Sequence, residues 1–269
     1  MSEQDITFSG SVPANYDRYL GPMLFQPSAE DLAERLQVRP DGSVLELACG
    51  TGILSRVLRS KLAPTVKLMA TDLNEPMLQN AMRKLRVEEL VQWQVVDATN
   101  LPFADATYDA VVCQFGLMFV PDKRAAVRET YRVLKPGGSF LFNVWDAMEH
   151  NELAKIAHET IASFFDRDPP KFYEVPFGYH DRVEIEKLMR QEGFHAIQVS
   201  VVPKESNIRQ AEDAAKGLIE GNPVVLEIVE RDPSLVRKII DALTAAIKNR
   251  FGNSSVSAPM KAIIVQAQR

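Results

Sequence analysis

Strand-like and helix-like patterns alternate along the chain from about residue 28, and this alternation restricts the possible folds more than any other feature. Short apolar runs at residues 43–49, 66–72, 91–96, 108–113 and 139–144 are separated by segments whose apolar residues recur at helical spacing. Strands that alternate with helices of this length are joined by right-handed crossovers, so the strands run parallel. Helices then cover both faces of the sheet. The sequence therefore predicts a doubly wound α/β fold.

The second half of the chain adds two more strands and two helical insertions. Residues 196–202 and 257–268 have strand patterns, which extends the prediction to a mostly parallel sheet of seven strands. Asp181 with Glu184 forms a capping-box start for a helix that ends at Gly193. Residues 147–180 and 204–252 are mainly helical and have no core of their own. We therefore expect one domain over 1–269, with a strap or lid at 1–27, a core at 28–146 and the insertions as a cap.

Composition excludes several classes of protein. The 269 residues include 31 Lys+Arg and 36 Asp+Glu, a formal net charge of −5, and the basic residues are scattered. Such a chain offers no basic field to hold nucleic acid. No apolar run approaches the roughly 18 residues of a membrane span, and the N-terminus is polar, so we expect a soluble, cytoplasmic protein. Its two cysteines, Cys49 and Cys113, lack metal-ligand spacing, and we expect no metal.

Glycines and acidic residues follow the predicted strands at positions that suit a ligand. Gly50 and Gly52 come directly after the first strand and before a helix, where backbone N–H groups are exposed. Asp72 ends the second strand and Asp97 follows the third. The carboxyl ends of neighbouring parallel strands meet at one crevice, and an acid about 20 residues after such a turn suits ribose hydroxyls. A nicotinamide enzyme shares these features, but the third glycine of its fingerprint is missing.

Four segments together resemble the class I S-adenosylmethionine-dependent methyltransferases, a group that includes quinone-biosynthesis enzymes. They are VLELACGTG at 44–52, ATDLNEPML at 70–78, VVDATNLPFADATYDAVVC at 95–113 and RVLKPGGSFLF at 132–142. The resemblance covers about residues 28–146. It implies a Rossmann-like methyltransferase fold, S-adenosyl-L-methionine as the cofactor and a small-molecule methyl acceptor as the partner. The sequence indicates no particular oligomeric state.

The resemblance also implies a set of donor-binding residues. Asp72 is expected on the ribose hydroxyls, Leu73 and Met77 against the adenine, and Gln114 beneath the sulfonium. Ala48 departs from the glycine that the family often has, and its methyl group is expected to narrow the pocket. The whole implied set is Glu46, Ala48, Cys49, Gly50, Gly52, Asp72, Leu73, Met77, Asp97, Ala98, Gln114 and Phe115.

Methyl transfer from a sulfonium is an in-line displacement that requires alignment and the exclusion of water, and no nucleophilic side chain. His180, which follows Phe177-Gly178-Tyr179 in the predicted cap, is the candidate for a base if one is used. We expect acceptor-pocket or lid roles for Tyr16, Tyr19, Met23, Phe25, Phe177 and Tyr179. Two alternatives remain open at this point: a non-catalytic protein that binds the donor as a sensor or subunit, and a nicotinamide-dependent oxidoreductase.

Overall fold

The computed structural model describes residues 8–85 and 91–269, and a seven-stranded sheet organises them. The strand order is β3-β2-β1-β4-β5-β9-β6, and only β9 runs antiparallel to its neighbours β5 and β6. The predicted mostly parallel, doubly wound α/β fold is confirmed. The strands are β1 (Ser43–Leu47), β2 (Lys67–Asp72), β3 (Val91–Val95), β4 (Tyr108–Gln114), β5 (Leu134–Trp145), β6 (His195–Glu205) and β9 (Pro259–Gln268).

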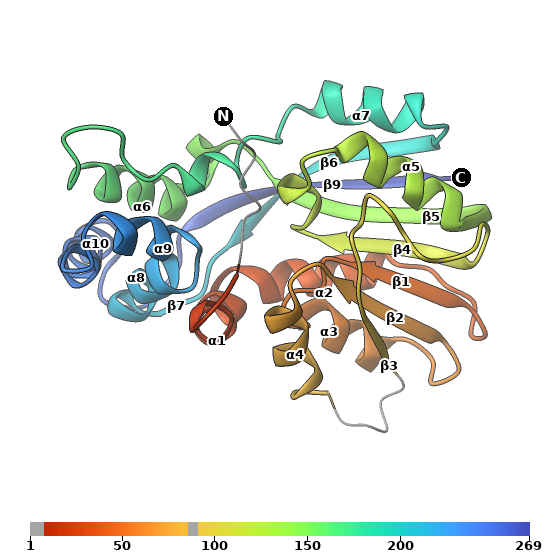
Figure 1. Ribbon diagram of the computed structural model, residues 1–269, viewed down its shortest axis with the longest axis horizontal. Coiled ribbons are helices and arrows are strands. Elements are labelled where there is room, and N and C mark those ends of the chain that lie inside the picture. The colour runs from red at the N-terminus through yellow and green to blue at the C-terminus, as the bar shows by residue number, and fades with distance from the viewer. Residues whose placement is uncertain (1–7, 86–90) are drawn as a thin grey trace.

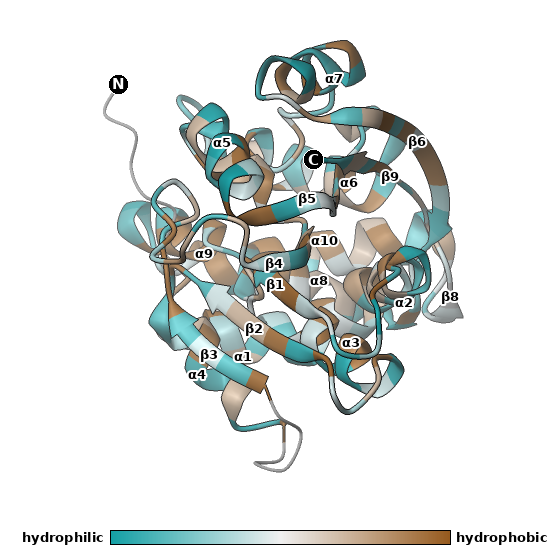
Figure 2. Cartoon of the chain, turned by 90° about the vertical axis from the view of Figure 1, so that its right-hand side faces the viewer, coloured by the Kyte–Doolittle hydropathy of each residue, from teal (hydrophilic) through white to brown (hydrophobic). Residues whose placement is uncertain are grey.

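Helices flank the sheet on two sides (Figures 1 and 2). Figure 2 shows the twisted sheet running from β3 to β6, with α5 on one side and α2 and α3 on the other. The predicted helix start at Asp181 is found at α7, where the Asp181 side chain caps the helix by accepting hydrogen bonds from the N–H groups of Val183 and Glu184. The flanking helices are α2 (Gln26–Arg35), α3 (Ile53–Lys61), α4 (Glu75–Met82), α5 (Lys123–Val133) and α7 (Arg182–Gln191), with short 3₁₀ turns η3 (Leu117–Phe119), η4 (Met148–His150) and η5 (Phe172–Glu174).

The chain reverses its direction of travel across the sheet between β1 and β4. From β1 it moves outward to β2 and β3, and it then returns to β4 and proceeds to β5 on the other side. Strands β1 and β4 are hydrogen-bonded neighbours, with Leu47 opposite Cys113 near their carboxyl ends. Ligands of open α/β sheets bind outside the carboxyl ends of strands at such a reversal. The sheet therefore defines where a ligand site belongs.

The insertions form a group of helices beyond that end of the sheet, on the left of Figure 1. Region 204–252, where the sequence indicates two helices, holds three. Apolar residues of these helices, such as Leu153, Leu218 and Ile240, belong to the same continuous core as the sheet. The elements of the group are α6 (Glu152–Ala162), α8 (Ala211–Glu220), α9 (Val224–Arg231) and α10 (Leu235–Phe251), beside a small hairpin of β7 (Ile208–Gln210) and β8 (Ser254–Val256).

The N-terminal segment is helical and leads directly into α2. It consists of α1 (Val12–Asn15) and a π-helical stretch, η1 (Tyr16–Phe25). It packs closely on α8, since a Cβ added to Gly217 would lie 2.7 Å from the Cβ of Tyr19. Asp17 also forms ion pairs with Arg56, at 3.7 Å, and with Lys84. We call residues 8–25 the strap, because they connect the cap helices to the sheet half of the molecule.

Candidate active site

A cleft of about 890 Å³ lies at the carboxyl ends of β1, β2 and β4, which is within the range typical of small-molecule sites. The strap and α9 contribute to its walls. Residues that are far apart in sequence and were predicted to bind a ligand meet here. Those that line the cleft are Tyr16, Ala48, Gly50, Asp72, Leu73, Met77, Asp97, Ala98, Gln114 and Phe115.

Asp72 occupies a fixed position in this cleft. Its carboxyl group is only 6% exposed. The N–H of Gly50 donates to Oδ2 at 2.8 Å, and the N–H of Asn74 donates to Oδ1 at 2.7 Å. Burial raises the pKa of Asp72, and these two N–H groups partly offset that rise. Each carboxyl oxygen keeps a second lone pair, so the group can accept two further hydrogen bonds from neighbouring hydroxyls of a ligand.

The glycine turn after β1 adopts the left-handed conformation at three positions. The φ angles are 51° at Ala48, 57° at Gly50 and 75° at Gly52. A Cβ at Gly52 would lie 2.9 Å from the Cβ of Ala81, so this glycine permits the close approach of α4. Gly52 and the neighbouring Cys49 do not line the cleft. Their predicted roles are thus indirect: they shape the turn that presents Gly50.

Glu46 lies behind the turn and not in the cleft. It is 1% exposed, and its Oε2 has no hydrogen-bond partner among the residues that the structure describes. Burial and the nearby Asp72 raise the pKa of Glu46 to about 8, although Ser55 and Arg56 act in the opposite direction. The implied direct contact with a bound donor therefore does not fit the structure. The cause is the strand geometry, which buries this side chain inside the sheet layer.

The end of β4 provides the floor between the cleft and a second cavity. Nε2 of Gln114 donates to the carbonyl oxygen of Phe25 in the strap at 3.0 Å, while its Oε1 has no partner in the described residues. Phe115 has a φ of 49°, and its N–H donates to Oδ1 of Asn143 at 2.9 Å. Its ring stacks on Trp145 with centroids 3.9 Å apart. These contacts hold both side chains at the boundary.

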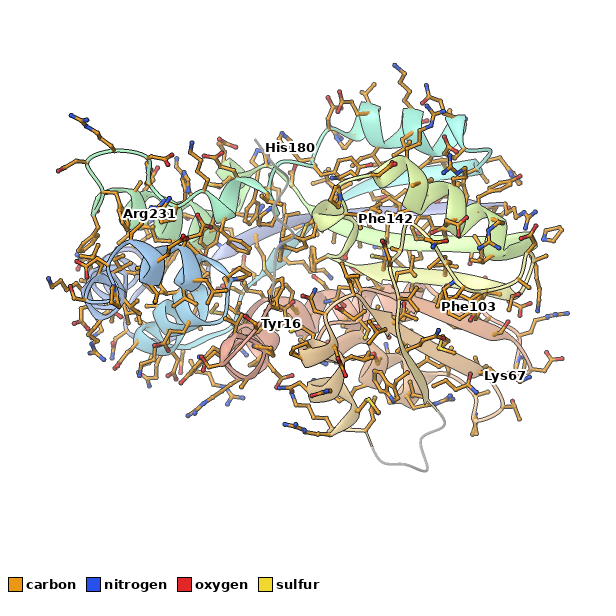
Figure 3. The ribbon with its side chains drawn as sticks, viewed as in Figure 1. Tyr16, Lys67, Phe103, Phe142, His180 and Arg231 are labelled. Atoms are coloured by element: carbon orange, nitrogen blue, oxygen red, sulfur yellow. The ribbon has the colours of Figure 1, made fainter. Side chains whose placement is uncertain are left out.

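The second cavity measures about 70 Å³, and most of its lining is apolar. It adjoins the cleft, because both are lined by Phe8, Tyr16, Phe115, Met118, Phe119 and Phe172. Figure 3 shows Tyr16 between the cap helices and the sheet, which is where the two spaces meet. Burial and the nearby Asp72 raise the pKa of Tyr16, so its hydroxyl stays protonated. The predicted Phe25 and Phe177 line this cavity.

Besides Glu46, Cys49 and Gly52, four more predicted residues lie outside both spaces. Tyr19 packs against α8, and Met23 is buried in the core. Tyr179 lies against Lys123, whose Nζ is 5.0 Å from the ring centroid. His180 is exposed, and its Nδ1 is 2.8 Å from the carbonyl oxygen of Phe177. The suggestion of a base at His180 does not fit this position, because the side chain reaches neither the cleft nor the cavity.

The sequence interpretation missed several lining residues. Met118 and Phe119 follow the carboxyl end of β4. The rule that ligands bind outside the carboxyl ends of strands was the one sequence signal that could have indicated them. Trp145 ends β5 and had the same signal. Asn222, in the turn between α8 and α9, and Phe8 in the strap had none, because only tertiary packing brings them to the cavity.

Two further observations concern the described residues alone. Within 8–85 and 91–269, no group of three or more His, Cys, Asp and Glu side chains is arranged to hold a metal ion. The same part of the chain contains no helix that is long and apolar enough to cross a membrane.

Comparisons with known proteins agree with this geometry. A family model described as a methyltransferase domain matches residues 45–142. The ubiquinone/menaquinone biosynthesis C-methyltransferase UbiE of Klebsiella pneumoniae is 33% identical over 176 residues, which cover 60% of this chain and 69% of that protein.

Solved structures share the fold. The YcgJ protein of Bacillus subtilis has a TM-score of 0.60 at 20% identity, over 90% of this chain and 98% of that one. Phosphoethanolamine N-methyltransferase 2 of Haemonchus contortus, solved with S-adenosyl-L-methionine, has a TM-score of 0.59 at 16% identity, over 96% of this chain and 56% of that one. At such identities the likeness concerns the fold alone.

Proposed function

The chain belongs to the class I S-adenosylmethionine-dependent methyltransferases, and from this premise we propose that the cleft binds the methyl donor and the apolar cavity receives the methyl acceptor. The reaction is methyl transfer from S-adenosylmethionine to a small molecule. The relatives bear the names of methyltransferases and not of sensors or nicotinamide enzymes, so we do not pursue those two alternatives.

The position of Asp72 is the observation that carries the donor proposal. Its two oxygens are held in place by backbone N–H groups, and each can accept one hydroxyl of a ribose. Leu73, which is 56% exposed, and Met77 supply apolar surface beside it for a flat base. Asp97 lies at the same edge, where its Oδ1 already accepts from the N–H and hydroxyl of Thr99. We assign Asp72 to the ribose and the other three to the adenine.

The cleft also suits a cation. Asp72, Asp97 and the unpartnered Oε1 of Gln114 place negative charge or negative partial charge along its wall. The bound donor would supply an electrophilic methyl group on a positively charged sulfur. Phe115 lines both the cleft and the cavity, and Gln114 lines the cleft beside it, so the two residues would align the reactants across that boundary.

The strap and cap would exclude water from the reaction. Phe8 and Tyr16 line both spaces, and Tyr16 is held by stacking on Phe25 with centroids 4.7 Å apart. We assign residues 1–27 to a lid, 28–146 to the donor-binding core, and 147–180 and 204–252 to the acceptor cap. Water in the cavity would compete for the methyl group and weaken the electrostatic contacts, so a closed lid favours transfer.

Two finer assignments accompany this function. We propose that the protein acts in the cytoplasm on a free small molecule, and not on nucleic acid. The net charge of −5 supports this proposal, since it offers little attraction to a phosphate backbone.

Calorimetry with S-adenosylhomocysteine, the demethylated donor, tests the donor site. Wild type should bind it, and Asp72→Ala should bind at least tenfold more weakly, because two charge-assisted hydrogen bonds are lost. Asp105→Ala is the control, since Asp105 is 74% exposed in its pair with Arg132 and does not line the cleft. An absence of wild-type binding would refute the donor cleft, and undiminished binding by Asp72→Ala would refute the ribose assignment.

A further inference from the structure

We propose that Asn222 selects acceptors that carry an uncharged O–H or N–H group, by presenting its side-chain carbonyl oxygen to the apolar cavity. This inference rests on the proposed function, because it takes that cavity as the acceptor site. Asn222 lies in the turn between α8 and α9, lines the cavity and is 9% exposed.

Neighbouring groups determine which end of the Asn222 amide is available. Its Nδ2 donates to the carbonyl oxygen of Leu218 at 3.1 Å and is 3.4 Å from the hydroxyl oxygen of Tyr173. A backbone carbonyl can only accept, so the end of the amide that faces Leu218 must be the nitrogen. Rotating the amide by half a turn would place two acceptor oxygens against each other. The chemistry of Leu218 therefore fixes the orientation of the side chain.

The other end of the amide is unused. The Asn222 carbonyl oxygen accepts no hydrogen bond from the described residues. It also differs from the fully buried side-chain atoms that lack partners, such as Oε2 of Glu46, because it keeps some accessible surface. Amide oxygens removed from water without a partner destabilise a structure. A ligand that donates a hydrogen bond to this atom would remove that penalty, and a ligand of the same shape without a donor would not.

The group that orients Asn222 is itself held firmly. The Tyr173 hydroxyl donates to the same Leu218 carbonyl at 2.6 Å and is buried. Burial raises the pKa of Tyr173 well above its ordinary value, so the hydroxyl remains a donor. The Tyr173 ring lies edge-on to Phe172, with centroids 5.5 Å apart. Little rearrangement of Asn222 is needed to form the proposed bond, which favours selectivity.

The remaining polar side chains of the cavity do not offer the same site. Asn151 is fully used, because its Nδ2 donates to the carbonyls of Asp146 and Ala147 and its Oδ1 accepts from the N–H of Lys261. The Tyr16 hydroxyl forms no hydrogen bond with the residues that the structure describes, but it can both donate and accept, so it does not discriminate between donors and acceptors. Among the described side chains that line the cavity, only the Asn222 oxygen requires a donor.

The lining also favours a neutral acceptor group. Apart from the two tyrosines, the described residues around the cavity include no ionisable side chain. A carboxylate or phosphate entering it would find no cation and would face the partial negative charge of the Asn222 oxygen. An ammonium group would find no carboxylate to pair with. Buried charges without partners are strongly unfavourable, so an uncharged donor such as a hydroxyl, indole or amide N–H fits best.

Binding of two matched probes to the full chain tests this inference. Phenol and toluene have nearly the same shape, but only phenol can donate to Asn222. We expect Asn222→Leu, which keeps the number and branching of the side-chain heavy atoms, to lower the ratio of phenol affinity to toluene affinity about three- to tenfold. Tyr173→Phe removes a neighbouring hydroxyl but keeps the Asn222 oxygen, so it should retain a phenol preference. Benzoate and benzylammonium should bind wild type more weakly than phenol.

Several results would overturn it. An unchanged phenol-to-toluene ratio in Asn222→Leu would do so, as would binding of neither probe to wild type, or tighter binding of either charged probe. Asn222→Ala gives the same comparison of ratios if the leucine variant does not fold. Binding of S-adenosylhomocysteine separates this inference from the proposed function: if it binds normally to wild type and both variants, a failed ratio test refutes only the role of Asn222.

Discussion

The buried carboxyl group of Glu46 should make the protein less stable as the pH rises through neutrality. Its pKa increases from an ordinary 4.5 to about 8 in the folded state, chiefly because of burial. Between these values the folded protein holds a proton that the unfolded chain releases. The free energy of unfolding therefore falls with increasing pH over this window, by up to about 1.4 kcal/mol per pH unit from this one group.

Glu46→Gln removes the titration while keeping the shape of the side chain. We compare the free energies of unfolding of the variant and of wild type. The variant's value minus the wild-type value should increase by roughly 2 to 3 kcal/mol between pH 5 and pH 7, because this interval spans two pH units at about 1.4 kcal/mol each. The amide also introduces a buried N–H pair that costs about 1 to 3 kcal/mol if unpaired, but that cost is independent of pH. The slope of the difference, and not its value at one pH, is thus the quantity to measure.

Urea denaturation followed by tryptophan fluorescence at several pH values between 5 and 8 provides the measurement. Titrating groups remote from Glu46 contribute equally to both proteins, so they cancel in the difference. Glu159→Gln serves as the control, because the Glu159 side chain is 63% exposed and its profile should run parallel to that of wild type. Parallel profiles for wild type and Glu46→Gln would refute the reasoning, since they would mean that Glu46 titrates alike in the folded and unfolded chain.

Two further substitutions test the turn and the strap. Gly52→Ala should lower the free energy of unfolding by about 2 to 4 kcal/mol, because it combines a left-handed φ with a Cβ 2.9 Å from α4. Gly137 has a similar φ of 78° but open space around it, so Gly137→Ala should lower the free energy of unfolding by only about 1 to 2 kcal/mol. Equal losses for the two variants in urea denaturation would contradict the packing argument. Asp17→Asn removes the ion pairs with Arg56 and Lys84. We expect the dissociation rate of S-adenosylhomocysteine, measured by stopped flow, to increase severalfold in this variant. An unchanged rate would show that these ion pairs do not hold the strap closed.

The mostly parallel arrangement of the strands and the residues at the strand ends were predictable, since they follow from simple rules on alternating strands and helices. Gly50, Asp72 and Asp97 meet in one cleft because each follows a strand whose carboxyl end faces the same way. Glu46 shows where that reasoning stops. It belongs to the same segment as Gly50, but the alternation of side chains along a strand and the depth of the layer bury it behind the turn.

The acceptor side was less predictable, because it depends on contacts between distant segments. The sequence predicted acceptor-pocket roles for both Phe177 and Tyr179, and it does not distinguish Phe177, which lines the cavity, from Tyr179, which packs against Lys123. Asn222 gains its significance only because folding brings it to a cavity that is also lined by residues as distant as Tyr173, which is 49 residues away. Periodicity reports which face of an element is buried, and it carries no information about which turn meets which ring.

The departure at Ala48 has a physical counterpart on the neighbouring strand. A left-handed φ of 51° costs an alanine about 1 to 2 kcal/mol relative to glycine, so the methyl group is retained against a local preference. A Cβ built on Gly116 would lie only 2.3 Å from the Cβ of Ala48 and 2.9 Å from Sγ of Cys113. Gly116, which follows the end of β4, has no side chain and therefore leaves room for the methyl group of Ala48. The narrowing of the pocket by Ala48 stays a prediction, but the close approach of the segments that follow β1 and β4 requires a glycine at 116 as long as position 48 carries a methyl group.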